Sequence, residues 1–512
     1  MRRGLLASFL LASCLILAGC AIGLPPRPPV HESHAIADHE STTLGKLVAA
    51  SLDGGFGSGF QLLPVGPTAL ETRLVIGKLA ERTLDVQTFV IRPDATGSEL
   101  MDSLVKAAAR GVRVRLLVDD LNTAGVDAIL VSLSERPNVE VRLFNPFRVG
   151  RNSLEARLMQ SLADLRRINH RMHNKLFIAD NAIAIFGGRN VGDDYFMRAA
   201  TANFVDFDVL GGGSVVRELS ETFDDYWNSE FAYPLRSIVN PATSSPGALP
   251  RPVIEPQNDA VPARLERYTR AAADLESGRL TLAGAEAHVK ADLVSKIAGS
   301  RVTDPTGTVR AFIGDLMHAA TKEIFVISPY YVPGKESMEY MRKLSAAGVS
   351  MKLLTNSLAA TDEPMAHGGY LRYRKEMLEL GVHIYELSPT LSRRAGRLAR
   401  FGESFGRLHA KVIVVDRRML FVGSMNLDAR SERYNTELGV LIDSRALAED
   451  FLELMTFETS SYRLRLNPST NEVEWVTGEG ADEKVWTSEP EASLWLRFKA
   501  RLLGGLVPEG WL

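Results

Sequence analysis

The sequence predicts an α/β protein made of two copies of one domain, each a sheet with helices on both sides. The pattern His-x-Lys-x4-Asp occurs once in each half, from His173 to Asp180 and from His409 to Asp416. Short runs rich in β-branched residues alternate with stretches of helical period in both halves. Near-continuous apolar strands of this kind are typical of sheets that helices cover on both faces.

The similarity between the halves extends well beyond the two tetrads. An asparagine, Asn190 or Asn426, lies 17 residues after each tetrad histidine and completes a Gly-x-x-Asn turn. Upstream, a Gly-Val turn that opens a strand lies 62 residues before His173 and 61 residues before His409. Self-similarity at matched spacing indicates a duplicated structural unit.

The N-terminus has the composition of an export signal. Arg2 and Arg3 precede a short apolar run over residues 5–18, which is too brief for a stable membrane span. The run ends in Leu17-Ala-Gly-Cys20, which resembles the lipobox of bacterial lipoproteins and implies cleavage before Cys20 and its acylation. An ordinary secretory signal is the alternative. After cleavage no thiol remains, because Cys14 and Cys20 are the only cysteines.

Composition divides the rest of the chain. Residues 20–61 are rich in Pro, Gly and Ser and are predicted to form a tether. The first domain is expected over residues 62–239 and the second over 308–460, joined by a linker and helical segment over 240–307. Residues 461–512 form a C-terminal extension, in which the run from Leu494 to Leu503 predicts an amphipathic helix.

The paired tetrads suit covalent phosphodiester chemistry without a metal. Residues two apart on a strand share a face, so His173 and Lys175 are expected to project together. One imidazole would attack phosphorus, and the other would protonate the leaving alcohol and then deprotonate the acceptor. The non-bridging oxygens would be held by the lysines and asparagines of both halves, which are Lys175, Lys411, Asn190 and Asn426.

The same residues resemble the phospholipase D superfamily and, within it, the bacterial cardiolipin synthases, most closely the type C branch. The resemblance covers residue 62 to the C-terminus, and it is carried by Leu84-Asp-Val-Gln-Thr, Arg142-Leu-Phe-Asn-Pro146, Arg171-Met-His-Asn-Lys175, Gly187-Gly-Arg-Asn190, Leu354-Thr-Asn-Ser-Leu-Ala-Ala360 and Asn435-Thr-Glu437. It implies two α/β/α sandwich domains related by a pseudo-twofold axis, with the active site at their interface. It also implies that His173 is the nucleophile and His409 the acid and base, an order that the sequence alone does not decide.

Supporting residues follow from the repeat. A carboxylate usually orients a nucleophilic histidine, and Asp206 and Glu437 occupy matching places in the two halves, with Asp208 a near competitor. Asp180 and Asp416 end their strands, where a salt-bridged scaffold role and a direct role are equally expected. The commoner family turn is Gly-Ser-x-Asn; Ser424 keeps it, whereas Gly188 replaces the serine in the first half.

The predicted function is therefore a phosphatidyltransferase, a cardiolipin synthase, that needs no cofactor or metal. Its partners would be phospholipids (phosphatidylglycerol or phosphatidylethanolamine) and a membrane surface, at the periplasmic side of the bacterial cell envelope. A net charge of −3 argues against nucleic acid as a partner. Three alternatives stay open: a hydrolase that releases phosphatidic acid, a nuclease-type phosphodiesterase, and an envelope scaffold without catalysis. The sequence does not indicate the oligomeric state or which membrane is used.

Overall fold

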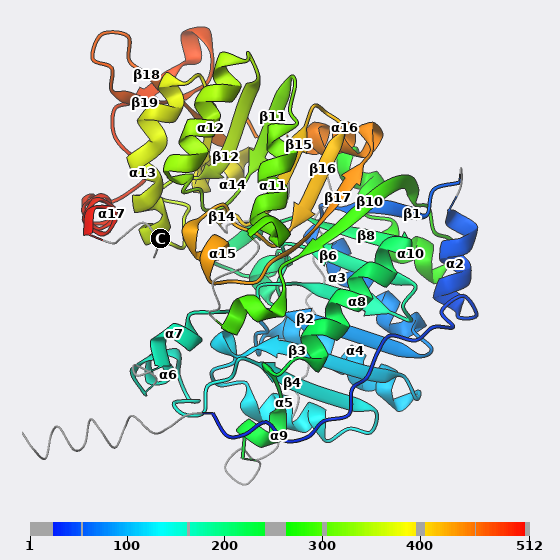
Figure 1. Ribbon diagram of the computed structural model, residues 1–512. Helices are drawn as coiled ribbons and strands as arrows, with labels where there is room; N and C mark the ends of the chain where they lie inside the picture. The colour runs from blue at the N-terminus through cyan, green and yellow to red at the C-terminus, as the bar shows by residue number, and fades with distance from the viewer. Residues whose placement is uncertain are drawn as a thin grey trace, which may run out of the picture.

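The computed structural model describes residues 24–52, 55–160, 164–240, 263–298, 305–395, 405–455 and 457–506. It shows two mixed sheets, one from each half of the chain, with helices covering both (Figure 1). The predicted fold class is confirmed. The predicted signal peptide and Cys20 lie outside the described residues.

The first sheet has a parallel centre and antiparallel flanks. Strand β2 (Thr83–Thr88) pairs in parallel with β3 (Arg113–Asp119), which pairs in parallel with β4 (Val139–Phe144). Beyond β2 come β5 (Leu176–Ala179), β6 (Ile183–Gly187), β8 (Asp208–Gly213) and β1 (Ser58–Leu63), and beyond β4 comes β9 (Ala232–Pro234), all antiparallel to their neighbours.

The second sheet repeats this order and these directions. Strands β11 (Glu323–Ile327), β12 (Ser350–Asn356) and β13 (His383–Leu387) form its parallel centre. Antiparallel strands follow on one side as β15 (Val412–Val415), β16 (Met419–Gly423), β17 (Leu438–Asp443) and β10 (Ala283–Ala291), and on the other side as β18 (Ser461–Leu466), β19 (Val473–Thr477) and β20 (Lys484–Trp486). Strand β10 also pairs with β1 and so joins the two sheets.

Helices form three layers around the two sheets. The outer core of the first half contains residues of α3 (Gly66–Leu79), α4 (Ala95–Ala109) and α5 (Asp127–Ser134). Its counterpart in the second half contains α11 (Val309–His318), α12 (Gly334–Ala346) and α13 (Pro364–Glu379). A central core between the sheets includes α8 (Ser214–Asn228) and α16 (Arg445–Leu454) together with strand residues from both halves.

Local sequence explains where several helices begin. Asp94, Thr308 and Ser444 precede α4, α11 and α16, and each side chain accepts a hydrogen bond from a backbone N–H of the first turn. The remaining helices are α2 (Thr43–Ser51), α6 (Leu154–Gln160), α7 (Leu165–Ile168), α9 (Leu235–Ile238), α10 (Ala271–Glu276), α14 (Pro389–Ala395), α15 (Ala429–Arg433) and α17 (Leu494–Leu506). No helix in the described part of the chain combines the length and apolarity that crossing a bilayer requires.

Three segments differ from what composition predicted. Residues 24–52 are packed rather than a free tether: Arg115 Nη1 donates to the Ser33 carbonyl at 2.6 Å, and the Ala35 N–H donates to Asp224 Oδ2 at 2.7 Å. Residues 240–307, predicted as a linker and helical segment, also contribute the bridging strand β10. The second sheet continues beyond residue 460, because β18 pairs with β13.

Candidate active site

The two tetrads meet where each half places a short segment beside the other. The His173 N–H donates to the Thr436 carbonyl at 2.9 Å, which places the first tetrad beside the second half. In the equivalent contact of the second half, β14 (Phe405–Leu408) pairs with β7 (Ala202–Val205), and the His409 N–H donates to the Val205 carbonyl at 2.8 Å. The chain neighbours Asp206 and Glu437 are thereby brought to the histidine of the opposite half.

Each histidine is hydrogen-bonded to a carboxylate across this seam. His173 Nδ1 lies 2.9 Å from Glu437 Oε2, and His409 Nδ1 lies 2.6 Å from Asp206 Oδ2. Both imidazoles are nearly closed off, with exposed fractions of 5% and 6%. The competitor Asp208 does not reach a histidine; it forms a buried ion pair with Arg73 at 2.8 Å. Each imidazole therefore has its Nδ1 fixed, which leaves Nε2 for chemistry.

Both tetrad lysines are buried beside the histidines. Lys175 Nζ donates to the His173 carbonyl at 2.5 Å, and Lys411 Nζ donates to the His409 carbonyl. Burial lowers the pKa of Lys175 to about 7 and that of Lys411 to about 8, while the carboxylates of Glu437 and Asp206 oppose this shift. Binding an anionic phosphate would raise both pKa values, since it favours the charged form.

The two asparagines have different surroundings. Asn190 is held on both sides: its Oδ1 accepts from the Val90 N–H at 3.2 Å, and its Nδ2 donates to the Tyr195 hydroxyl at 2.9 Å. Asn426 is also buried, but its Oδ1 has no hydrogen-bond partner among the described residues.

The electrostatics of the two histidines are unequal. Burial lowers the pKa of His173 well below its ordinary value, and the positive charges of Lys175, Lys411 and His409 lower it further. Burial and Lys411 also lower the pKa of His409, but Asp206 acts in the opposite direction. The pKa of Asp206 is itself lowered to about 2 by His409 and Lys411, against the effect of burial. His409 thus has the stronger hold on a proton, and His173 is the more readily neutral imidazole.

The difference between Ser424 and Gly188 follows from the two carboxylates. Ser424 Oγ donates to Glu437 Oε2 at 2.5 Å and accepts from the Leu438 N–H at 3.0 Å. At Gly188, a Cβ would lie 2.0 Å from Asp206 Oδ1, so no side chain fits there while Asp206 keeps its position. The hydroxyl contact of the second half is therefore absent from the first.

Asp180 and Asp416 lie at the far ends of β5 and β15 from the tetrad lysines. Asp180 accepts hydrogen bonds from the backbone N–H groups of residues 81, 82 and 83. Asp416 accepts from those of residues 321, 322 and 323 in the same manner. Their carboxylates fix the start of the neighbouring strand through backbone contacts. The sequence had left two roles equally expected, a salt-bridged scaffold and a direct role, and these contacts favour a scaffold without the salt bridge.

Sequence reasoning missed a second pair of positioning residues. Asp119, at the end of β3, accepts the Met172 N–H at 2.8 Å and forms an ion pair with Arg171 at 3.2 Å. Asn356, at the end of β12, accepts the Leu408 N–H at 2.8 Å. Both lie eight residues after the matched glycines of the repeat, so their equivalent spacing was the available signal.

Aromatic side chains also pack against the imidazoles and were not predicted. The Phe89 ring contacts His173 edge-on, with centroids 4.9 Å apart. Tyr195 and Phe204 contact His409 at 5.1 and 5.0 Å. These rings restrict the rotation of the imidazoles and exclude water around them.

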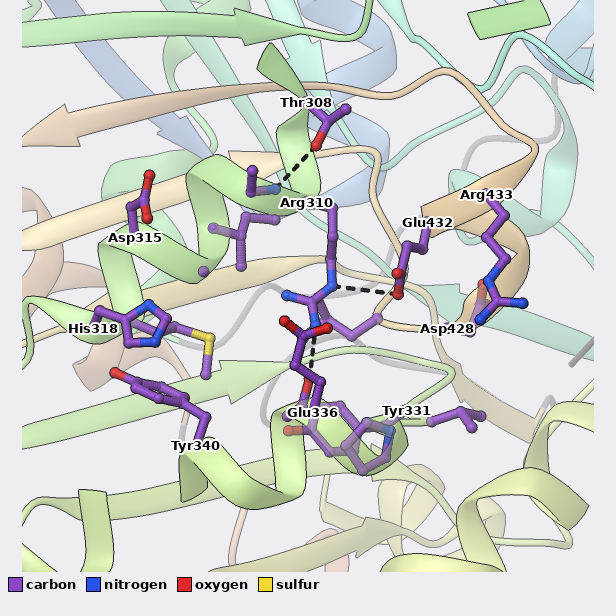
Figure 2. Close-up of a pocket in the computed structure, with 18 of the residues that line it drawn as sticks. Thr308, Arg310, Asp315, His318, Tyr331, Glu336, Tyr340, Asp428, Glu432 and Arg433 are labelled. Atoms are coloured by element: carbon purple, nitrogen blue, oxygen red, sulfur yellow. Dashed lines mark hydrogen bonds and ion pairs between the residues drawn. The ribbon is translucent and has the colours of Figure 1, made fainter. Parts of the chain in front are cut away.

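A cavity of about 910 Å³ lies beside this site, between α11, α12 and α15 (Figure 2). No tetrad residue lines it. Its wall includes Lys296, whose Nζ donates to Asp292 Oδ2 at 2.7 Å, and the same oxygen accepts the Glu437 N–H at 3.1 Å. Arg310 and Glu432 form an ion pair at 3.5 Å within it. The cavity thus lies beside the Lys296–Asp292 pair that binds the Glu437 backbone, and the two histidines do not line it.

Among the described residues, no three His, Cys, Asp or Glu side chains gather in a way that could hold a metal ion. The arrangement offers instead two imidazoles, each on a carboxylate, and two buried lysines. A site of this kind, at the interface of two duplicated α/β domains, is typical of phospholipase D-like enzymes.

Comparisons with known proteins agree with this class. A family described as "Cardiolipin synthase, PLD-like domain" matches residues 77–227 and 313–456, once in each half. The chain belongs to this family, whose members are enzymes of phosphatidyl transfer.

Individual relatives give the same result. Cardiolipin synthase C of Escherichia coli (strain K12) is 36% identical over 455 residues, which cover 87% of this chain and 94% of the relative. Cardiolipin synthase A of Pseudomonas entomophila (strain L48) is 25% identical over 398 residues, covering 77% and 67%. The crystal structure of phosphatidylserine synthase from Haemophilus influenzae Rd KW20 shares the fold with a TM-score of 0.54 at 13% identity, covering 91% of this chain and 96% of that one.

Proposed function

We propose that this chain is a phosphatidyltransferase that makes cardiolipin through a phosphohistidine intermediate. The observation that carries the proposal is the pairing of each tetrad histidine with a carboxylate of the opposite half. Membership of the cardiolipin synthase family supports a phospholipid substrate. Phosphatidylglycerol is the proposed acceptor, and phosphatidylglycerol or phosphatidylethanolamine is the proposed donor.

In the first step, His173 Nε2 attacks the phosphorus of the donor. A P–N bond forms, and the bond between phosphorus and the headgroup oxygen breaks in line with it. His409, protonated at Nε2, gives its proton to the departing alkoxide. Lys175 and Lys411 offset the charge that builds on the non-bridging oxygens, together with the amides of the paired asparagines.

In the second step the proton moves in reverse. The acceptor hydroxyl loses its proton to His409, and its oxygen attacks phosphorus while the P–N bond to His173 breaks. With a phosphatidylglycerol hydroxyl as acceptor the product is cardiolipin, whereas water would give phosphatidic acid. The near-complete burial of both imidazoles supports transfer, because it limits the access of water to the intermediate.

The unequal electrostatics support this order of roles. A nucleophilic imidazole must be neutral, and the pKa of His173 is lowered by burial and by neighbouring positive charges, which include Lys175 and Lys411. A general acid must hold a proton; burial and Lys411 lower the pKa of His409, but Asp206 offsets part of this, so His409 keeps its proton more readily than His173 does. Asp206 and Glu437 act as positioning residues that hold each Nδ1–H.

The proposed location is the periplasmic side of the cell envelope, with Cys20 as the lipid anchor. The support is the lipobox-like Leu17-Ala-Gly-Cys20 at the end of a short apolar run. Metabolic labelling with a fatty acid that carries a click-chemistry handle tests this directly. The full chain should incorporate the label and the Cys20→Ser variant should not; label retained by that variant would contradict the assignment.

Lipid chromatography tests the catalytic proposal. Cells that lack their own cardiolipin synthases should gain a cardiolipin band with this chain and should lose it with His173→Ala or His409→Ala. Phosphatidic acid without cardiolipin would identify a hydrolase. DNA cleavage by the purified chain without lipid turnover would identify a nuclease, and no turnover of either kind would favour a scaffold.

A further inference from the structure

The C-terminal helix α17 has the reverse of the usual orientation for an amphipathic helix on a protein surface. The side chains that it buries are small, Ala500 and Gly504. Leu496 and Leu503 are half-buried, but most of its large apolar side chains point outward: Leu494 is 80% exposed, Trp495 70% and Leu506 73%. A helix that packed on the protein to bury its apolar face would place these residues inward.

The contacts that hold α17 keep it in this orientation. A Cβ at Gly504 would lie 2.4 Å from the Gly368 carbonyl oxygen of α13, so the two backbones are in close contact. Arg372 Nε donates to the Gly504 carbonyl at 2.7 Å, and Arg497 Nη2 donates to the Glu489 carbonyl at 2.6 Å. Rotation that turned the apolar face inward would break this glycine contact and both arginine hydrogen bonds.

The exposed face forms one continuous stripe along α17. Leu494, Phe498, Leu502 and Leu506 recur at intervals of four residues, and the Trp495 ring stacks on Phe498 with centroids 5.7 Å apart. We call these five residues the α17 stripe. A contiguous exposed apolar surface on a folded protein marks a site of contact with a membrane or another protein.

The charges of α17 favour a membrane. Arg497, Lys499 and Arg501 lie within residues 494–506, and this range contains no acidic residue. Basic residues that flank an apolar stripe are attracted to anionic phospholipid headgroups while the apolar side chains enter the acyl boundary.

A second group of exposed apolar side chains lies on α6. Helices α6 and α17 both project from the left side of the molecule in Figure 1, below and above the seam between the two halves. In α6, Leu154, Leu158 and Met159 are 38%, 40% and 67% exposed. A bilayer placed along this side of the molecule would contact both helices.

We propose that the α17 stripe inserts into the interface of an anionic phospholipid bilayer and that α6 faces the same bilayer, so that the seam between the two halves lies against the membrane. This contact is additional to the catalytic proposal and to lipid anchoring, because it concerns how the folded body is oriented and not whether the chain is attached.

Quenching of tryptophan emission by brominated lipids tests the insertion. The full chain is reconstituted into vesicles of phosphatidylglycerol and phosphatidylethanolamine with brominated or ordinary acyl chains. Insertion predicts that brominated lipid quenches the emission, and that Trp495→Phe removes most of the quenched component. Because turnover is not needed, the result is independent of the proposed enzymatic activity.

Matched variants separate the stripe from apolar exposure in general. Phe498→Ser should reduce the quenching by at least about twofold. Phe56→Ser should leave it unchanged, since Phe56 is similarly exposed (45% against 53%) but lies outside α17. Leu494→Ser serves as a second stripe variant that does not disturb the stacking on Trp495.

Two results would overturn the proposal. The first is Trp495 emission that is equal in brominated and ordinary vesicles. The second combines two observations: the unaltered chain shows no quenching, and it forms an oligomer in detergent that Phe498→Ser converts to monomer. The α17 stripe would then be an interface between copies of this chain.

Discussion

Removing the hydroxyl of Ser424 should move the acidic limb of the pH–rate profile to higher pH. Burial raises the pKa of Glu437 to about 7, and the hydrogen bond from Ser424 opposes this rise. Glu437 must be ionised to accept the Nδ1–H of His173 and leave Nε2 unprotonated. Activity is therefore lost as pH falls through the pKa of Glu437, and a higher pKa moves that loss upward.

The size of the expected shift in the acidic midpoint follows from the hydrogen bond between Ser424 and Glu437. The Ser424 hydroxyl lies 2.5 Å from Glu437 Oε2 in a fully buried setting. A hydrogen bond to a charged group contributes about 1.5–3 kcal/mol. At 1.36 kcal/mol per pKa unit, Ser424→Ala should raise the acidic midpoint by about one to two units.

The assay is kcat for phosphatidyl transfer across the neutral pH range, for the unaltered chain and Ser424→Ala. Ser444→Ala is the control, because Ser444 caps α16 through its side chain and has no contact with Glu437. It should lower stability by about 1 kcal/mol without moving the midpoint. An acidic midpoint that stayed in place, or moved to lower pH, would refute the role assigned to Glu437.

Three other results are expected. Gly188→Ser, which restores the commoner family turn, should abolish transfer rather than improve it. The new Cβ would lie 2.0 Å from Asp206 Oδ1 and would displace the Asp206 carboxylate from His409. Activity near the original level in a transfer assay would contradict this. Asp206→Asn should lower kcat by about 10²–10⁴-fold, as loss of an orienting carboxylate does elsewhere, and an effect on KM alone would contradict it. Asp180→Ala should lower the free energy of unfolding by about 1–3 kcal/mol through unpaired backbone N–H groups, while kcat of the folded protein stays unchanged; a selective loss of kcat would instead show a direct catalytic role.

Much of the site could be predicted because it is encoded in local patterns. A histidine and a lysine two residues apart at the start of a strand project to the same face wherever the strand lies. The shared orientation of His173 and Lys175 could therefore be predicted from the sequence. Duplication supplied more of the site, since Asp206 and Glu437 each lie in the first strand-like run after the Gly-x-x-Asn turn of their half and so could be matched as equivalent. The pairing of each histidine with the opposite half was not readable, because it depends on how the two domains pack.

Other features depend on contacts that sequence patterns do not report. Asp180 at a strand end looks alike whether it binds a substrate or three backbone N–H groups. The absence of a serine at position 188 was explained only by the position of Asp206. Residues 20–61 were predicted as a tether because Pro, Gly and Ser indicate a lack of regular structure, yet Arg115 and Asp224 bind the backbone of Ser33 and Ala35 and hold this part to the first domain.

The central claim is that the two half-sites act on one phosphorus, with His173 as the residue that carries the phosphatidyl group. Mass spectrometry of peptides from a reaction stopped within a single turnover, at alkaline pH to preserve the P–N bond, tests this most directly. We expect a phosphatidyl adduct on the peptide that contains His173 and none on the peptide that contains His409. An adduct on His409 alone, or product formation without an adduct on either histidine, would contradict it.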